Sequence, residues 1–541
     1  MARQIHLQTD DEAMKLTISE VNLQRDAEDA ADKHGGGGGV GVLRPSRICH
    51  LGVLSTAFWA FVFFMHYSGT QGASVLFKQP TFSIPPLLSG NTVGRGPSPP
   101  AQPPPLSALA VQAQSPPPAE AAAAAAAAAR ENRSVPAPAD RCAGRYIYMY
   151  DLPARFNDDL IRDCKHLWRF YDMCPLLANS GMGRPLGDEG GVFSPRGWYA
   201  TNQFTLDVIF HVRMRGYECL TGDPSLAAAL YVPFYASLDG GRHMWNSTAL
   251  RDALALDLVG WLARRPEWRA MGGRDHFMVA GRTAWDFRRY DDVDEQWGTK
   301  LLNNPGVQNM TVLILETSPW RRTNFAVPYP TYFHPETAAE VAAWQEKVRG
   351  AERTWLFAFA GAPHPWQRDT LRPEIFQQCG ASSRCRLFRC GRKGSASDCK
   401  SPGAVMRVFE ESDFCLQPRG DSLTRRSTFD AILAGCIPVF FHPGSAYTQY
   451  TLHLPKEPES WSVLIMHTDV SERNVSIEER LARIPPETVR AMREEVIRLI
   501  PRVVYANPTS RSVDFKDAFD VAVEAVIDRV AKRRRGDAEA R

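Results

Sequence analysis

A predicted corner between a strand and a helix carries the residues best suited to chemistry. Residues 413–418 have the length and apolar character of a strand, and Phe429, Ile432 and Leu433 follow with helical spacing. The polar residues between and beside them are Arg419, Gly420, Asp421, Ser422, Arg425, Arg426 and Asp430. Guanidinium groups bind phosphate through paired hydrogen bonds, and a helix N-terminus favours an anion. The corner therefore favours a nucleotide diphosphate, with Asp430 spaced to pair with Arg426 or to accept from a ribose hydroxyl. The alternative is an ordinary surface helix with an Arg–Asp ion pair.

The surrounding sequence predicts the strands and the helix that would position these side chains. Gly435 is suitably located to end the helix, and residues 437–441 are apolar throughout, which is typical of a strand buried on both faces of a parallel sheet. Strand, helix and strand then form a βαβ unit, and such units bind ligands at the carboxyl ends of their strands. The polar residues from Arg419 to Asp430, which we call the arginine corner, lie at one of those ends.

The chain on either side predicts further alternation of strands and helices. Strands are expected at 146–151, 227–234, 277–280, 312–316 and 355–360, and helices at 368–379, 487–500 and from about 515 to 530. This order predicts the α/β class with two Rossmann-like domains, at 144–345 and 350–535. A chain of 541 residues has room for both domains and for extensions.

The N-terminal part predicts a membrane anchor and a spacer. Residues 1–47 are polar, and residues 48–67 are almost wholly apolar without Asp, Glu, Lys or Arg, which suits a spanning helix. Arg44 and Arg47 precede this segment, so the positive-inside rule predicts a type II signal-anchor with a cytosolic tail. A cleaved signal peptide and a buried helix are the alternatives. Residues 68–140, rich in Pro and Ala, read as an extended stem.

Cysteines, sequons and charge indicate the compartment and the class of partner. Ten of the 11 cysteines follow the apolar segment, and Cys379, Cys385, Cys390 and Cys399 are spaced unlike zinc knuckles, so disulfides of unknown connectivity are expected. Cys415 and Cys436 lie in predicted strands and are interpreted as buried thiols. Asn132, Asn246, Asn309 and Asn474 head N-glycosylation sequons. Lys and Arg number 63 against 60 Asp and Glu, so no dominant field attracts nucleic acid.

Several segments also carry a family resemblance, over roughly residues 142 to 534. They are FCLQPRGDSLTRRSTFDAILAGCIPVFF, RYIYMYDLPARFN, GWYATNQFTLDVIFHVRM, DHFMVAGRTAWDFRR, PYPTYFHP and FHPGSAYTQYTLHLP. Together they resemble exostosin-type glycosyltransferases of family 47, in particular the plant xyloglucan galactosyltransferases. The resemblance implies two Rossmann-like domains of the GT-B type, a UDP-sugar donor such as UDP-galactose, inversion at the transferred carbon and no catalytic metal. It also implies a glycine and an arginine beside the phosphates, which here are Gly361 and Arg372.

Glycosyl transfer further requires a base for the acceptor hydroxyl and a surface for the sugar rings. Asp286 follows a predicted strand of the first domain and is the leading candidate for the base, and Asp239 is the second. Trp285 and Trp198 are candidate stacking platforms for the acceptor. The acidic segment 292–294 matches a DxD pattern but lacks the preceding apolar strand, so we interpret it as a solvated loop.

Two classes of function follow from these observations. One is a Golgi membrane enzyme that transfers galactose from UDP-galactose to xylosyl branches of xyloglucan, with a galacturonosyl or arabinosyl donor as the alternative and other Golgi glycosyltransferases as possible partners. The other is a non-catalytic Golgi scaffold for partner transferases. The charged corner at Arg419–Asp430 favours the enzyme, because a scaffold does not need a diphosphate site.

Overall fold

The computed structural model describes residues 140–318, 323–363, 370–390 and 401–536. The predicted tail, anchor and nearly all of the stem lie outside these residues, as do Asn132 and Cys399. Within the described part of the chain, no helix combines the length and the apolar character that a membrane crossing requires.

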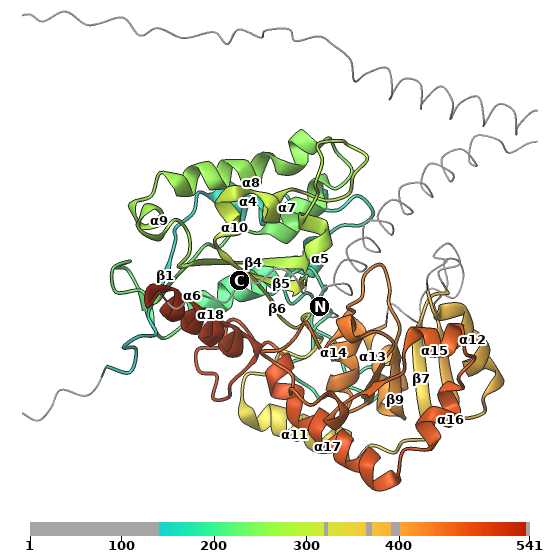
Figure 1. Ribbon diagram of the computed structural model, residues 1–541. Coiled ribbons are helices and arrows are strands. Elements are labelled where there is room, and N and C mark those ends of the chain that lie inside the picture. Colours follow the sequence, from blue (N-terminus) through green and yellow to red (C-terminus); the bar gives the residue numbers. More distant parts are fainter. Residues whose placement is uncertain (1–139, 319–322, 364–369, 391–400, 537–541) are drawn as a thin grey trace, which may run out of the picture. The chain divides into compact units, whose positions relative to one another are not determined.

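Two parallel sheets organise the described residues (Figure 1). The first has six strands in the order β2-β1-β3-β4-β5-β6, and the second has five in the order β11-β10-β9-β7-β8. The strands of the first are β1 (Ile147–Met149), β2 (Leu220–Thr221), β3 (Ala229–Tyr231), β4 (His276–Thr283), β5 (Thr311–Glu316) and β6 (Asn324–Ala326). Those of the second are β7 (Trp355–Gly361), β8 (Cys385–Arg389), β9 (Ser412–Gln417), β10 (Ile437–Phe440) and β11 (Val463–Leu464).

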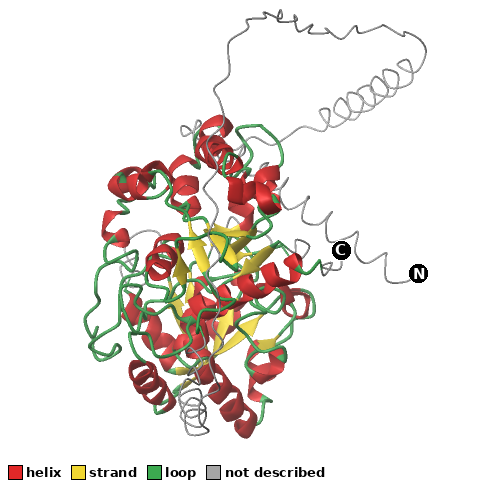
Figure 2. Cartoon of the chain, turned by 90° about the vertical axis from the view of Figure 1, so that its left-hand side faces the viewer, coloured by secondary structure: helices red, strands yellow, loops and turns green. Residues whose placement is uncertain are grey.

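Helices alternate with these strands and cover the sheets, as the red and yellow elements of Figure 2 show. Up to the end of the first sheet they are α4 (Asp158–Arg162), α5 (Cys174–Leu177), α6 (Leu206–Arg215), α7 (Ala236–His243), α8 (Thr248–Ala263), α9 (Pro266–Met271) and α10 (Pro305–Gln308). The later ones are α11 (Ala338–Arg349), α12 (Arg372–Ala381), α13 (Pro402–Glu410), α14 (Arg426–Leu433), α15 (His467–Ser471), α16 (Ile477–Ala482), α17 (Pro486–Val503) and α18 (Ala518–Arg534). The predicted α/β class with parallel sheets is confirmed.

The central strand β4 explains why the first sheet has a helix layer on each face. Its successive side chains point to opposite faces, as the two-residue period of a strand dictates. Met278 and Ala280 pack in one buried cluster with α8, whereas Phe277 and Val279 pack in another with α6. A strand buried on both faces favours apolar residues at successive positions, and for this reason the middle of β4 is an apolar run.

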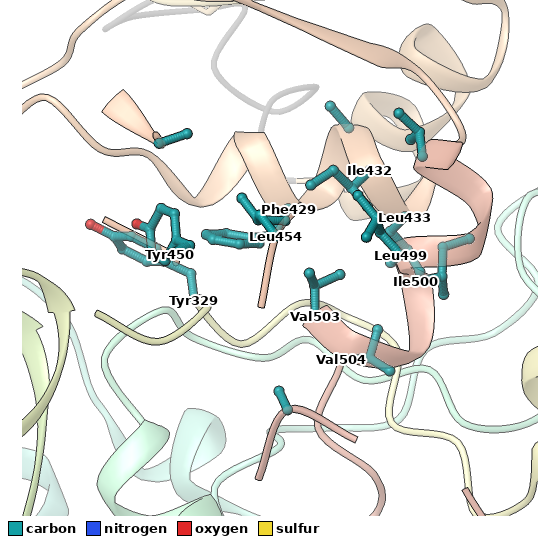
Figure 3. Packing of buried hydrophobic residues seen from close by; sticks show 14 of the residues in the cluster. Tyr329, Phe429, Ile432, Leu433, Tyr450, Leu454, Leu499, Ile500, Val503 and Val504 are labelled. Carbon is teal, nitrogen blue, oxygen red and sulfur yellow. The ribbon is translucent and has the colours of Figure 1, made fainter. Parts of the chain in front are cut away.

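The second sheet is covered in part by α14 and α17, which pack against each other through apolar side chains. Ile432 and Leu433 of α14 lie beside Leu499 and Ile500 of α17, and all four are fully or nearly fully buried (Figure 3). Burying one such side chain contributes about 1.5–3 kcal/mol, so this seam holds α14 firmly. The N-terminus of α14 carries the predicted arginine corner, and its position therefore depends on this packing.

The last helix, α18, returns to the first sheet. Arg529 donates a hydrogen bond to the carbonyl of Thr323 at 3.0 Å, and Arg533 donates to the carbonyl of Arg274 at 2.6 Å. Asp517 begins the helix with a capping box that includes Asp520. The C-terminal helix is joined in this way to the ends of strands in the first sheet.

The cysteines form disulfides in the described residues, as the sequence predicted for part of them. The pairs are Cys142–Cys219, Cys164–Cys174, Cys379–Cys385 and Cys415–Cys436, and Cys390 is also disulfide-bonded. The interpretation of Cys415 and Cys436 as buried thiols is therefore wrong. β9 and β10 are parallel neighbours, and this pairing brings Cys415 of β9 close to Cys436, which directly precedes β10. The apolar pattern alone does not show that these two side chains face each other.

Candidate active site

The arginine corner connects β9 to α14, as the sequence predicted. β9 ends at Gln417, a turn follows, and α14 begins at Arg426. The Gln417 side chain remains at the corner, where its Oε1 accepts a hydrogen bond from Ser427 Oγ at 2.6 Å. Its Nε2 is buried without a hydrogen-bond partner among the described residues. A buried amide of this kind is costly unless a ligand or water accepts from it.

Arg372 and Arg425 lie together beside the Arg419–Gly420 turn. Arg372, the first residue of α12, donates from Nη1 to the carbonyl of Ala362 at 2.6 Å and from Nε to that of Arg419 at 3.5 Å. Arg425 donates from Nη1 to the carbonyl of Pro418 at 3.3 Å. Burial and, to a smaller extent, the neighbouring charge of Arg372 lower the pKa of Arg425 to about 9. Arg372 is buried, Arg425 is half-buried, and the charge of Asp421 offsets part of their mutual repulsion. A dianion between the two guanidinium groups would stabilise both of them further.

Gly361 stands at the end of β7, on the same edge of the second sheet. A Cβ atom there would lie 2.7 Å from the ring of Phe359, so the position is too tight for a side chain. The chain then leads to Arg372, although residues 364–369 lie outside the described part. Gly361 thus ends β7 and Arg372 begins the next described helix, α12.

Arg426 extends in a different direction from Arg425. Its guanidinium carbon lies 3.7 Å from the centre of the Tyr332 ring, and Nη1 donates to the carbonyl of Thr201. The predicted pair with Asp430 is present, with 3.5 Å between Nε and Oδ2. Burial raises the pKa of Asp430 to about 6. Arg426 Nη2 and Asp430 Oδ1 are buried and have no hydrogen-bond partner among the described residues, so both atoms can still bond to a ligand or a water molecule.

Glu316, the last residue of β5, links the first sheet to the corner and was not among the predicted site residues. Its Oε2 accepts hydrogen bonds from the backbone nitrogen of Thr424 at 2.8 Å and from Thr424 Oγ1 at 2.6 Å. Burial raises the pKa of Glu316, the bonds from Thr424 oppose that rise, and the charge of Asp286 adds to it. The sequence did contain a signal, because an acidic residue ends the otherwise apolar run 312–316.

Asp286 lies on the same edge of the first sheet, in the 3-10 turn Ala284–Phe287 that follows β4. Thr283 is paired in register with Glu316, so the two carboxylates follow neighbouring strand ends. Trp297 donates from Nε1 to Asp286 Oδ1 at 2.7 Å, and Arg282 lies 3.5 Å from Oδ2. These two contacts fix the position of the carboxylate.

Further contacts join this edge to the second half of the chain. Tyr329 Oη and Thr424 Oγ1 are 3.0 Å apart, and Tyr450 donates to the carbonyl of Leu315 at 2.9 Å. Gln449 bonds both the backbone nitrogen and the carbonyl of Thr317, at 2.8 and 2.9 Å. Tyr329 and Tyr450 lie side by side with Phe429 in Figure 3. The end of β5 is therefore bound to the second sheet's loops over three successive residues.

Asp239, the second candidate base, lies elsewhere. It belongs to α7 and lines a cavity of about 350 Å³. The other lining residues include Arg155, Arg242 of α7 and Asp257 of α8. Burial raises its pKa to about 7. Among the described residues, no hydrogen bond or ion pair connects it to Asp286, Glu316 or the arginine corner. The structure thus brings Asp286 to the corner's side of the sheet and leaves Asp239 in a separate cavity.

The two candidate stacking tryptophans also differ. Trp198 is 2% exposed and packs between Phe193 and Phe333, with ring centres 4.3 and 4.7 Å away, so its interpretation as a sugar platform is wrong. The aromatic character that suggested a platform serves the core instead. Trp285 is half-buried and stacks on Trp297 at 5.2 Å, beside Asp286.

The acidic loop at 292–294 is engaged in local structure. Asp292 Oδ1 lies 2.6 Å from Lys300 Nζ, and Asp294 accepts a hydrogen bond from the backbone nitrogen of Thr248 at 2.5 Å, at the start of α8. The one cluster of three potential metal ligands found in the described residues is Cys164, Asp172 and Cys174, and its two cysteines are joined in a disulfide.

Comparison with known proteins relates this geometry to a family. The Exostosin GT47 domain matches residues 141–481. Xyloglucan galactosyltransferase MUR3 of Arabidopsis thaliana is 46% identical over 531 residues, which cover 93% of this chain and 85% of that protein. Xyloglucan-specific galacturonosyltransferase 1 of the same plant is 38% identical over 405 residues, covering 74% of this chain and 59% of that protein. The solved structure of the pneumococcal O-GlcNAc transferase GtfA with UDP and GlcNAc aligns with a TM-score of 0.24 and 9% identity, over 54% of this chain and 60% of that one. By its domain match and its identity to MUR3, the chain belongs to the exostosin GT47 family of glycosyltransferases.

Proposed function

We propose that this chain transfers galactose from UDP-galactose to xylosyl side chains of xyloglucan, with inversion at the transferred carbon. The identity to MUR3 supports the substrate class. The structural observation that carries the proposal is the hydrogen-bonded contact between Glu316 and Thr424. It brings the carboxylate edge of the first sheet against the arginine corner of the second, which are the two halves that such a transfer needs.

The arginine corner would take the nucleotide part of the donor. Arg372 and Arg425 would compensate the charge that develops on the leaving diphosphate, together with the backbone of the turn at Arg419, Gly420, Asp421 and Ser422. Both guanidinium groups are already held by carbonyl groups, so little reorganisation accompanies the reaction. The Arg426–Asp430 pair would contact the ribose or the transferred sugar through its unpaired buried atoms.

Asp286 would act as the base. In an inverting transfer the acceptor hydroxyl attacks opposite the leaving UDP, so the base must lie across from the arginines. Asp286 occupies the edge of the first sheet, where Trp297 and Arg282 hold its carboxylate in position. Glu316 would act as a positioning residue, because its carboxylate accepts hydrogen bonds from the turn that precedes α14, two of them from Thr424.

We assign the two sheets to the GT-B type and expect the arginines to replace a metal ion. Residues 48–67 would anchor the protein in the Golgi membrane with the folded part in the lumen. Three sequon asparagines in the folded part, Asn246, Asn309 and Asn474, are exposed, which supports a luminal location. Protease treatment of intact microsomes should then remove only residues 1–47; digestion of the folded part would refute this orientation.

A galacturonosyl donor is the second candidate, because a 38% identical relative is a galacturonosyltransferase. The experiment that separates the two is a donor screen. Full-length protein in microsomes is given UDP-galactose, UDP-galacturonic acid or UDP-arabinose with xyloglucan oligosaccharides, and products are analysed by mass. We expect a hexose to be added from UDP-galactose. Addition from UDP-galacturonic acid alone would favour the second candidate, and no transfer in the presence of UDP binding would favour a scaffold.

A further inference from the structure

Four aromatic rings form a continuous row that ends at Asp286. They are Phe170, Trp245, Trp297 and Trp285, and we call this set the aromatic row. Consecutive ring centres are 5.1, 5.8 and 5.2 Å apart. The four residues come from separate segments of the chain, so the row is a product of the tertiary fold rather than of one amphipathic element.

The inner end of the row is part of the candidate active site. Trp285 precedes Asp286 in the chain, and Trp297 donates its indole hydrogen to Asp286 Oδ1 at 2.7 Å. The outer end is open to solvent. Phe170 is 66% exposed and its neighbour Tyr171 is 44% exposed, whereas the three tryptophans are half-buried. The row therefore leads from the surface to the proposed base.

The outer end is held firmly although it is exposed. Phe170 and Tyr171 lie in a segment closed by the Cys164–Cys174 disulfide. Trp168 of the same segment packs edge-on against Trp245 at 5.1 Å, and the guanidinium of Arg282 lies 4.9 Å from the Trp168 ring centre. Large exposed aromatic side chains fixed in this way lose little conformational freedom on binding, which favours affinity.

We propose that the aromatic row binds the glucan backbone of a polysaccharide acceptor and directs one of its branches to Asp286. This inference rests on the proposed function and specifies where its acceptor lies. Sugar rings present C–H faces that pack on aromatic rings and hydroxyl groups that need polar neighbours. The row offers both, since the Tyr171 hydroxyl and Asn202 Nδ2, 3.4 Å apart, lie at its outer end and the carboxylate closes its inner end. Continuity with the candidate active site favours this occupant over a protein partner.

The test uses Phe170→Ala in the full-length protein, because this exposed ring can be removed without opening the core. The matched control is Leu256→Ala, which removes a side chain that is 57% exposed on α8. Galactose transfer is measured on xyloglucan oligosaccharides of one, two and three repeating units. For the wild type and the control, kcat/KM should rise with acceptor length. For Phe170→Ala, the ratio of long to short acceptors should fall by about two- to tenfold, mostly through KM.

The other outcomes are informative as well. An unchanged length dependence in folded Phe170→Ala, with normal UDP affinity by calorimetry, would overturn the inference and leave the proposed function intact. If the wild type transfers no galactose, direct binding of the same oligosaccharides by calorimetry still decides: affinity that rises with length and falls in Phe170→Ala supports the row, and length-independent affinity refutes it. A change of oligomeric state in Phe170→Ala, seen by light scattering, would instead identify the outer end as an interface between copies of the protein.

Discussion

The carboxylate of Glu316 accepts two hydrogen bonds from Thr424, a residue 108 positions later in the chain. One comes from the backbone nitrogen at 2.8 Å and the other from Oγ1 at 2.6 Å. Through this contact the end of β5 fixes the turn that precedes α14. The side chain of Glu316 therefore directly connects the proposed acceptor side of the site to its donor side.

Glu316→Gln should weaken UDP binding although Glu316 is not proposed to touch UDP. The amide can replace only part of the charge-assisted bonding, which is worth about 1.5–3 kcal/mol per bond, and the turn would become less well fixed. We expect the UDP dissociation constant, measured by calorimetry, to rise up to about tenfold. Glu487→Gln, on an exposed position of α17, is the control. Unchanged UDP affinity in a folded Glu316→Gln protein would mean that the contact only stabilises the fold.

Arg425→Ala should weaken UDP binding more than Arg426→Ala does. Arg425 lies with Arg372 beside the turn, whereas the Arg426 guanidinium covers Tyr332. Loss of a charge-assisted phosphate contact predicts a UDP dissociation constant that rises about ten- to a hundredfold for Arg425→Ala. Calorimetry on both variants measures the difference. A larger effect of Arg426→Ala would relocate the phosphates to the Tyr332 side of α14.

The local part of this site could be predicted from sequence, and the long-range part could not. The apolar run, polar turn and helical spacing around Arg425 identify a strand-to-helix corner without a structure. They do not say that Arg425 and Arg426 diverge, because this depends on Arg425 being the extended residue before the helix and Arg426 being the first helical residue. The Glu316–Thr424 contact joins two sheets, and no local pattern encodes it. Trp198 and Trp285 are the same residue type, and only the packing separates the core residue from the half-exposed one.

Asp286→Asn should abolish most turnover and retain UDP binding. The variant is nearly isosteric and keeps an oxygen for the indole hydrogen of Trp297, but it cannot accept the acceptor's proton. Removal of a general base typically costs about 10²–10⁴ in rate. Initial-rate kinetics with saturating UDP-galactose give the loss in kcat, and calorimetry gives UDP affinity. If Asp286→Asn retains full turnover while Glu316→Gln loses it, Glu316 rather than Asp286 is the base.

Removal of divalent cations should leave transfer unaffected. The arginine corner is proposed to compensate the diphosphate, and Asp294 is committed to the backbone of Thr248 at the start of α8. We expect equal rates with and without EDTA, and full activity in Asp294→Ala with a slightly lower melting temperature. Activity that disappears with EDTA and returns with Mn²⁺ would contradict the metal-free proposal.

Asp239→Asn should make the protein more stable at alkaline pH. Burial raises the pKa of Asp239 from the ordinary value of 3.8 to about 7. Between these values the folded state binds a proton that the unfolded state has lost, so this group lowers the free energy of unfolding as pH rises through the window. Above pH 7 the full cost of ionising the buried carboxyl is present, on the order of 1–4 kcal/mol. The asparagine variant should therefore melt at nearly the wild-type temperature at pH 4.5 and at a higher temperature at pH 8.

Asp528→Asn, at an exposed position of α18, should shift neither value. Because Asp207 is also buried with its pKa raised to about 7, part of the wild-type pH dependence should remain in Asp239→Asn. An asparagine variant that is no more stable than wild type at pH 8 would show that Asp239 ionises in the fold without cost.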